Sequence, residues 1–347
     1  IQTLCYVLIG NLVLGIQGLY LDYWLVLFAT SCFANLLGLN ISSAFNSVIT
    51  IYILIPILLI PQLLLGGVIV KFDKLHPILA SQNVVPFSGD IMVSRWAFEA
   101  LSVNQYKSNA FEKFFYPYDK VMSIASYKRN YWQSELKKRL ETCKIYHDDT
   151  EKKEWVQQSF KVIQNEILKE IETNPYVVLK MDINNFIALS NFEISIENII
   201  SIYLSEIKNY YNNLYNAASV ARNKMMGEVQ KSMPNKEDFI LFRDNYQNEN
   251  LSDLVKNANT VNKVIEFNNE LIQKVDPIYL DGQALRAHFF APTKKIFGKQ
   301  IDTFWVNLGV IWLLSTLLFV TLYFNTLKKL LDLIDIWSKK FSYANKK

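Results

Sequence analysis

Residues 48–70 read VITIYILIPILLIPQLLLGGVIV, a run without a charged side chain. About 20 apolar residues in a helix cover the roughly 30 Å of hydrocarbon in a bilayer, so the run is long enough to span a membrane. Pro56 and Pro61 lie inside it, where proline kinks a helix or leaves carbonyl groups for neighbouring elements to bind. The amphipathic segment SRWAFEALSVNQY follows at residues 94–106. Trp96 and Tyr106 in this segment are typical of a membrane interface.

Charge separates two kinds of sequence along the 347 residues. Residues 1–70 hold one charged side chain, Asp22, whereas most of the Lys, Arg, Asp and Glu lie in residues 105–300. The net charge of +4 is small and spread out, which does not indicate a nucleic-acid partner. Three cysteines are too few for a disulfide framework.

This pattern predicts an all-α membrane protein with four transmembrane helices and a large helical insert before the last one. The expected domains are three transmembrane helices at 1–70, a re-entrant or amphipathic outer segment at 71–104, a helical insert at 105–300, the last transmembrane helix at 301–327 and a basic tail at 328–347. Ile1 falls directly into an apolar helix pattern without an initiator Met, so we expect the chain to be cut from something longer.

Four polar side chains in the second span are expected to face protein, because unpaired polar groups are costly in hydrocarbon. They are Asn35, Asn40, Ser42 and Ser43. Bonding between helices explains them better than substrate contact.

The insert shows apolar residues at helical spacing in four segments. The predicted helices are 126–143, 150–172, 195–231 and 251–275, and 176–181 is a candidate short strand. Ser195 and Ser252 are plausible N-caps.

Lysines flank the last span on its C-terminal side, whereas the short loop 17–23 contains no Lys or Arg. The positive-inside rule therefore predicts a multi-pass protein of the cytoplasmic (inner or plasma) membrane with a cytoplasmic C-terminus and an extracytoplasmic insert.

No motif for catalysis, metal binding or phosphate binding occurs in the chain. His147 before two aspartates is typical of a solvated helix end. The tyrosines at 203, 210, 211 and 215 have helical spacing, which favours a core over a glycan- or peptide-binding face. Catalysis by this chain is not expected.

Residues 66–70 and 94–106 resemble the permease of G-type (White or pleiotropic-resistance-like) ABC exporters, of the type-2 ABC membrane family. In that family the fifth span ends in a small-Gly pair and two apolar residues, and a re-entrant segment follows. The matching positions of this segment are Arg95, Trp96, Ala97, Phe98, Ala100, Leu101, Asn104 and Tyr106. The resemblance covers residues 1–106 and 301–327 and leaves out the insert.

The resemblance implies a half-transporter that pairs with a homo- or heterodimer partner permease in the lipid membrane. An upstream nucleotide-binding domain with ATP and Mg, and two earlier spans, would precede Ile1. The implied substrate cavity residues are Pro56, Ile60 and Leu63, the implied apolar plug is Val68 and Ile69, and the re-entrant motif residues are Arg95, Trp96, Phe98, Asn104 and Tyr106. Pro56, Pro61 and Gln62 depart from the family's usual fifth span, so we expect a cavity of different shape.

Two functions remain open from the sequence. The first is an ATP-driven exporter that moves an apolar or amphipathic substrate through a cavity at the dimer axis by alternating access. The alternative is a non-transporting membrane anchor whose helical outer domain senses a ligand or scaffolds a cell-envelope complex.

Overall fold

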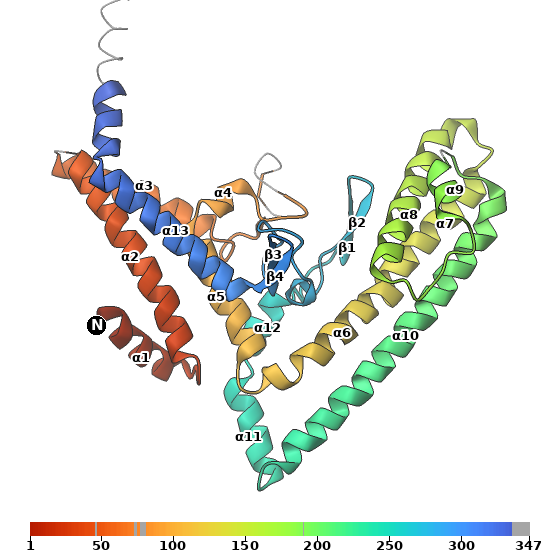
Figure 1. Ribbon diagram of the computed structural model, residues 1–347, viewed down its shortest axis with the longest axis horizontal. Helices are drawn as coiled ribbons and strands as arrows, with labels where there is room; N and C mark the ends of the chain where they lie inside the picture. The colour runs from red at the N-terminus through yellow and green to blue at the C-terminus, as the bar shows by residue number, and fades with distance from the viewer. Residues whose placement is uncertain (46, 73–74, 77–80, 190, 335–347) are drawn as a thin grey trace, which may run out of the picture. The chain divides into compact units, whose positions relative to one another are not determined.

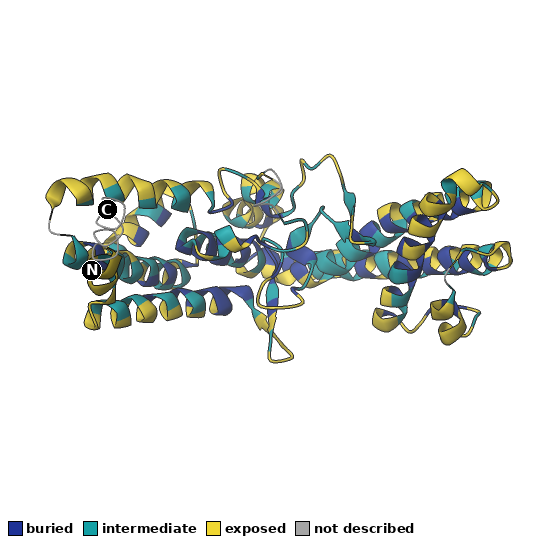
Figure 2. Ribbon diagram, turned by 90° about the horizontal axis from the view of Figure 1, so that it is seen from above, coloured by how far each residue is buried: buried dark blue, intermediate teal, exposed yellow. Residues whose placement is uncertain are grey.

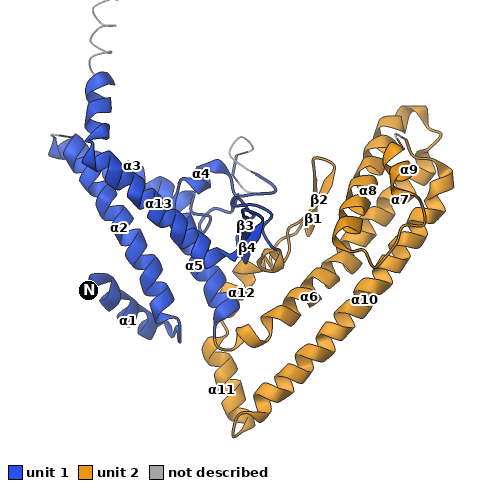
Figure 3. Ribbon diagram, in the orientation of Figure 1, with its two compact units in different colours: residues 1–109, 281–347 blue, residues 110–280 orange. Residues whose placement is uncertain are grey.

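The computed structural model describes residues 1–45, 47–72, 75–76, 81–189 and 191–334. The chain forms two compact units: unit 1 comprises residues 1–109 and 281–347, and unit 2 comprises residues 110–280 (Figure 3). Parts of the predicted outer segment at 71–104, and the predicted tail from residue 335 onward, lie outside the described residues.

Unit 1 consists of apolar helices, an amphipathic helix and a β-hairpin (Figure 1). Its elements are α1 (Gln2–Leu14), α2 (Tyr20–Ala44), α3 (Val48–Leu64), α4 (Phe87–Asp90), α5 (Val93–Ser108), β3 (Thr293–Ile296), β4 (Lys299–Asp302) and α13 (Thr303–Tyr323). Gly15 ends α1 with a φ of 68°, which glycine adopts without strain. Asp302 caps α13, because its carboxylate accepts a hydrogen bond from the N–H of Phe304 at 3.1 Å.

Among the described residues, α2 and α13 are the two helices long and apolar enough to cross a membrane, with 25 and 21 residues. The helices α1 and α3 are apolar as well but shorter, with 13 and 17 residues. The four predicted spans therefore correspond to four apolar helices, two of which reach the length that a bilayer requires. The count of four spans stays a prediction.

The helices α2, α5 and α13 pack around one apolar cluster. It contains Val26, Ala29, Val93, Trp96, Ala97, Ala100, Phe304, Leu308 and Ile311. Asn40 joins α2 to α13: its Nδ2 donates to the carbonyl of Leu318 at 2.9 Å, and Thr321 donates to its Oδ1 at 3.0 Å. This confirms that Asn40 faces protein.

Asn35 and Ser42 are exposed in this single chain, and for these two residues protein contact stays a prediction. Residues seven apart on an α-helix share a face, so Asn35 and Ser42 lie together on a face away from Asn40.

Unit 2 is mostly helical, with one β-hairpin (Figure 1). Its longer elements are α6 (Tyr116–Tyr127), a π-helical turn (Lys128–Trp132), α7 (Gln133–Tyr146), α8 (Lys153–Thr173), α9 (Ile183–Ala188), α10 (Ile194–Lys231), α11 (Lys236–Tyr246), α12 (Glu249–Val255), β1 (Val264–Phe267) and β2 (Glu270–Gln273). Three 3-10 turns lie at Glu112–Phe114, Thr150–Lys152 and Pro277–Tyr279.

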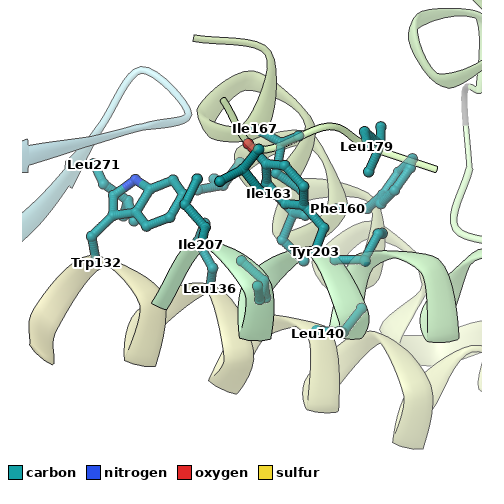
Figure 4. Close-up of a cluster of buried hydrophobic side chains, with 14 of the residues drawn as sticks. Trp132, Leu136, Leu140, Phe160, Ile163, Ile167, Leu179, Tyr203, Ile207 and Leu271 are labelled. Carbon is teal, nitrogen blue, oxygen red and sulfur yellow. The ribbon is translucent and has the colours of Figure 1, made fainter. Parts of the chain in front are cut away.

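The longer helices of unit 2 have a buried side and an exposed side (Figure 2). Their buried sides supply the apolar residues of a core. The apolar faces of α7, α8 and α10 meet in the core drawn in Figure 4, to which Trp132, Leu136, Phe160, Ile163, Ile167, Tyr203, Ile207 and Leu271 contribute. This core belongs to unit 2 alone.

Two carboxylates of α8 tie the core to its neighbours. Glu166 accepts from the indole N–H of Trp132 at 2.6 Å and from the backbone N–H of Leu271 at 2.8 Å, so it joins the π turn to β2. Glu170 accepts from Lys128 at 2.6 Å and from the hydroxyl of Tyr211. These bonds satisfy charges that would be costly to bury alone.

The described residues are mostly helical, as predicted, but they also contain two β-hairpins, which an all-α class leaves out. The segment 251–275, predicted as one helix, holds α12 followed by β1 and β2. Asn268 and Asn269 form the turn with φ of 53° and 59°, and Asn tolerates this left-handed conformation better than most residues. In the β3–β4 hairpin the turn residues Phe297 and Gly298 have φ of 49° and 83°.

Smaller corrections concern helix starts and one strand. Residues 176–181 form no strand. Glu193, not Ser195, precedes α10, and Asn248, not Ser252, caps α12 by accepting from the N–H of Leu251 at 3.0 Å. Capping depends on which side chain reaches the unpaired N–H groups of the first turn, which a sequence pattern locates only within a few residues.

Candidate functional site

The implied cavity residues share one face of α3. Pro56, Ile60 and Leu63 follow each other at spacings of four and three residues, which places them in one row on a helix. In this chain the row is open: Ile60 is 53% exposed and Leu63 is 59% exposed. No residue of α3 is buried.

The helix α3 continues through both prolines. Pro56 and Pro61 lack the N–H that a helix interior requires, so two carbonyl groups lose their helical donor there. The helix ends after Pro61, whose carbonyl accepts from the N–H of Leu65 at 2.8 Å.

Gly66 and Gly67 turn the chain at the end of α3, and the implied plug follows directly. Gly67 has a φ of 82°, in the left-handed region that favours glycine. Val68 and Ile69 project from this turn with 46% and 64% of their surface exposed. Together with the exposed row on α3 they form a continuous apolar surface, which is typical of a face that lipid or a second chain covers.

The re-entrant motif lies on α5. Arg95, Trp96 and Tyr106 are buried there, whereas Phe98 and Asn104 are half-buried. The motif therefore serves largely as the inner face of α5 against α2 and α13.

Glu99 lies within the motif segment but was not among the predicted site residues. It is the centre of a group of buried polar side chains. One carboxylate oxygen, Oε2, accepts three hydrogen bonds: from Arg95 at 2.8 Å, from Lys294 at 2.6 Å and from Asn307 at 2.7 Å. Lys294 also donates to Oδ1 of Asn307 at 2.8 Å. The Glu99 cluster, meaning Glu99, Arg95, Lys294 and Asn307, thus joins α5 to β3 and α13.

Burial affects the pKa values of the two charged groups Glu99 and Lys294. Glu99 is 0% exposed and Lys294 is 1% exposed. Burial by itself favours the neutral form of Glu99, but Lys294 and Arg95 outweigh this effect and the pKa of Glu99 lies below its ordinary value. Burial also lowers the pKa of Lys294, while Glu99 opposes the shift. The carboxylate therefore stays ionised at neutral pH.

Asp90 extends the cluster toward the surface. It forms ion pairs with Arg95 and with Arg286, whose Nε lies 2.7 Å from Oδ2 of Asp90. The Trp96 indole donates to the carbonyl of Asp90 at 2.7 Å, and the Arg95 guanidinium lies 3.4 Å from the Trp96 ring centroid. This arrangement fixes the start of α5.

Sequence reasoning missed Glu99 for a definable reason. Arg95 and Glu99 stand four apart, a spacing that also occurs in ordinary surface pairs. Lys294 lies 195 residues further along the chain, among lysines that sequence alone assigns to the flank of a span.

The tyrosines and the histidine of unit 2 that were weighed as binding residues lie in or beside a core, or at a helix end, as expected of structural residues. Tyr203 and Tyr211 are buried in the core of unit 2, and Tyr210 and Tyr215 pack against it. His147 follows α7 and contacts the carbonyl of Lys144 at 3.0 Å in an exposed position. Within the described ranges, no group of three or more His, Cys, Asp or Glu side chains is placed to hold a metal ion.

The family of ABC-2 type transporters matches residues 1–106 of the chain, a range that contains α1 to α4 and ends at Tyr106 in α5. Neither a curated protein nor a solved structure matches the chain. Together with the apolar helices, the match indicates a membrane protein. Residues 1–106 are thus similar to the membrane domain of ABC-2 type transporters, which is the transmembrane part of an ABC-type transporter.

Proposed function

We propose that the chain is the permease portion of an ATP-driven exporter of the G type, working as half of a dimer. The exposed apolar row on α3 carries this proposal, because a helix inside the matched domain that buries none of its residues is available to face a second permease chain. Pro56, Ile60 and Leu63 would line a cavity between the two chains. An apolar lining suits an apolar or amphipathic substrate.

Val68 and Ile69 close this cavity on its outer side in the proposal. Their exposure at the end of α3 supports the assignment, since two copies of an apolar pair meeting at a dimer axis exclude water. ATP and Mg bind to a nucleotide-binding domain outside this chain. Nucleotide opens the plug only if it binds one conformation of the transporter more tightly than the other.

The C-terminus lies in the cytoplasm and unit 2 lies outside the membrane in this proposal, as the distribution of lysines predicts. Unit 2 has a core of its own. In this proposal it is a folded outer unit to which an envelope partner binds.

Two measurements test the function. Candidate substrates added to proteoliposomes that contain the chain and its nucleotide-binding partner should stimulate ATP hydrolysis. A non-transporting anchor, in which the helical outer unit senses or scaffolds, should show no stimulation with any substrate. Ile69→Asp should abolish efflux at an unchanged protein level, because a carboxylate in the plug attracts water. Normal efflux in this variant would refute the plug.

A further inference from the structure

The end of α3 and the start of α5 satisfy each other's unpaired backbone groups. The last carbonyls of any helix and its first N–H groups have no partner within the helix. Gln62 lies in the last turn of α3 and Ser94 in the first turn of α5. Their side chains and main chains are joined across 32 residues of sequence.

Two hydrogen bonds make this contact reciprocal. The hydroxyl of Ser94 donates to the backbone carbonyl of Gln62 at 2.5 Å. The backbone N–H of Ser94 donates to Oε1 of the Gln62 side chain at 3.2 Å. Each residue therefore caps the helix end of the other, and we call this pair of bonds the Gln62–Ser94 clamp.

The glycine turn is shaped around the clamp. A Cβ atom on Gly66 would lie 2.9 Å from the carbonyl oxygen of Gln62 and 3.2 Å from the hydroxyl oxygen of Ser94. A Cβ on Gly67 would lie 2.6 Å from the ring of Phe72 and 2.9 Å from that of Phe289. Because neither glycine has a side chain, Gly66 can lie close to the clamp and Gly67 close to the two phenylalanine rings.

The plug residues follow this turn without an intervening residue. Val68 and Ile69 are exposed, so their own side chains do little to fix them within this chain. Their position follows from the backbone at Gly66 and Gly67, which the clamp holds against α5. The Glu99 cluster in turn holds α5 against β3 and α13.

We propose that Gln62 and Ser94 are positioning residues of the apolar plug, which keep Val68 and Ile69 in the closed position by locking the outer end of α3 to the start of α5. The inference rests on the proposed function and adds to it two residues that touch no substrate. Weakening the clamp loosens the plug and leaves the rest of the permease in place.

The test is a leak measurement on the full-length protein in proteoliposomes, together with its nucleotide-binding partner and without ATP. The observable is the rate at which a potassium-ion gradient decays. Ser94→Ala removes the hydroxyl and Gln62→Met removes the side-chain acceptor at similar length. Each should raise the leak about tenfold, which corresponds to about 1.4 kcal/mol in favour of the open plug. Ser94→Thr keeps the hydroxyl and should restore the low leak.

Two further variants serve as the negative and the positive control. Thr316→Ala is the matched control, because the hydroxyl of Thr316 donates to the carbonyl of Trp312 at 2.9 Å, a bond within α13 itself. Its leak should equal that of the unmodified protein. Ile69→Ala opens the plug directly and should leak. Melting temperature and yield identify any variant that does not fold. If Ser94→Ala does not fold, the leak of Gln62→Met alone tests the clamp.

The outcomes separate the two proposals. A leak in Ile69→Ala with none in Ser94→Ala or Gln62→Met overturns the clamp and leaves the plug intact. No leak in Ile69→Ala overturns the plug and, with it, the role of the clamp. A leak in the clamp variants that Ser94→Thr does not show supports positioning, since general loosening of the fold would also appear in the melting temperature.

Discussion

The Glu99 cluster allows a prediction with a worked magnitude. Glu99→Gln removes the negative charge and leaves the ammonium of Lys294, 1% exposed, with neutral neighbours only among its close contacts: the amide oxygens of Asn307 and of the new Gln, and the Trp96 ring. Removing one member of a buried ion pair costs about 3 to 5 kcal/mol, because the other charge stays buried. We therefore expect a loss of about 4 kcal/mol in the free energy of unfolding.

Lys294→Met should cost less, about 3 kcal/mol, since Glu99 keeps its bonds to Arg95 and Asn307. The double variant removes both charges. Its cost should fall at least about 1 kcal/mol below the sum of the two single costs, as for other residues in direct contact.

The assay is denaturant unfolding of the purified chain in detergent micelles, carried out on both single variants and on the double variant. Arg286→Met is the control, because Arg286 is itself exposed and pairs with Asp90 at the edge of the cluster, so its loss should cost only about 1 kcal/mol. Additive costs in the double variant would refute the reasoning, since they would mean that Glu99 and Lys294 do not depend on each other.

Three further predictions concern unit 2. Burial raises the pKa of Cys143 to about 12, so its thiol stays protonated at pH 8 and should not react with a thiol reagent until the chain is unfolded; rapid labelling of the folded protein would contradict this. Glu166→Leu leaves the Trp132 indole N–H and a β2 backbone N–H unpaired and should cost about 3 kcal/mol in chemical unfolding, and Glu166→Gln, which keeps one acceptor, should cost less. Asn269→Val places a β-branched side chain at a φ of 59° and should lower the stability by about 1 kcal/mol in thermal unfolding, whereas Asn269→Gly should be neutral; equal melting temperatures would exclude strain at the turn.

The sequence located the elements whose signal is long and continuous. The helix predicted at 195–231 is α10, Ile194–Lys231, and the last span begins and ends within a few residues of α13, Thr303–Tyr323. Long amphipathic or apolar runs repeat one signal over many turns, so their positions survive local exceptions.

Short strands and contacts between residues distant in sequence were not predicted. Each hairpin strand has four residues, too few to show alternation, and the turns at Asn268–Asn269 and Phe297–Gly298 are weak signals. The pairing of Glu99 with Lys294 depends on how α5 and β3 pack, which no local pattern contains. The Gln62–Ser94 clamp was missed in the same way: Gln62 stood out only as a polar departure from an apolar span.

The π turn at Lys128–Trp132 has a consequence for chain-length variation in unit 2. A π turn holds one residue more than the α-helical turn it replaces, so it absorbs an extra residue that would rotate the rest of a regular α-helix by about 100°. Deleting a single residue there would give an unbroken α-helix in which Leu136 and Leu140 still face the core that they fill. A regular α-helix of the present length would instead turn both leucines away from the core, so the π turn keeps the apolar face of α7 aligned with that of α10.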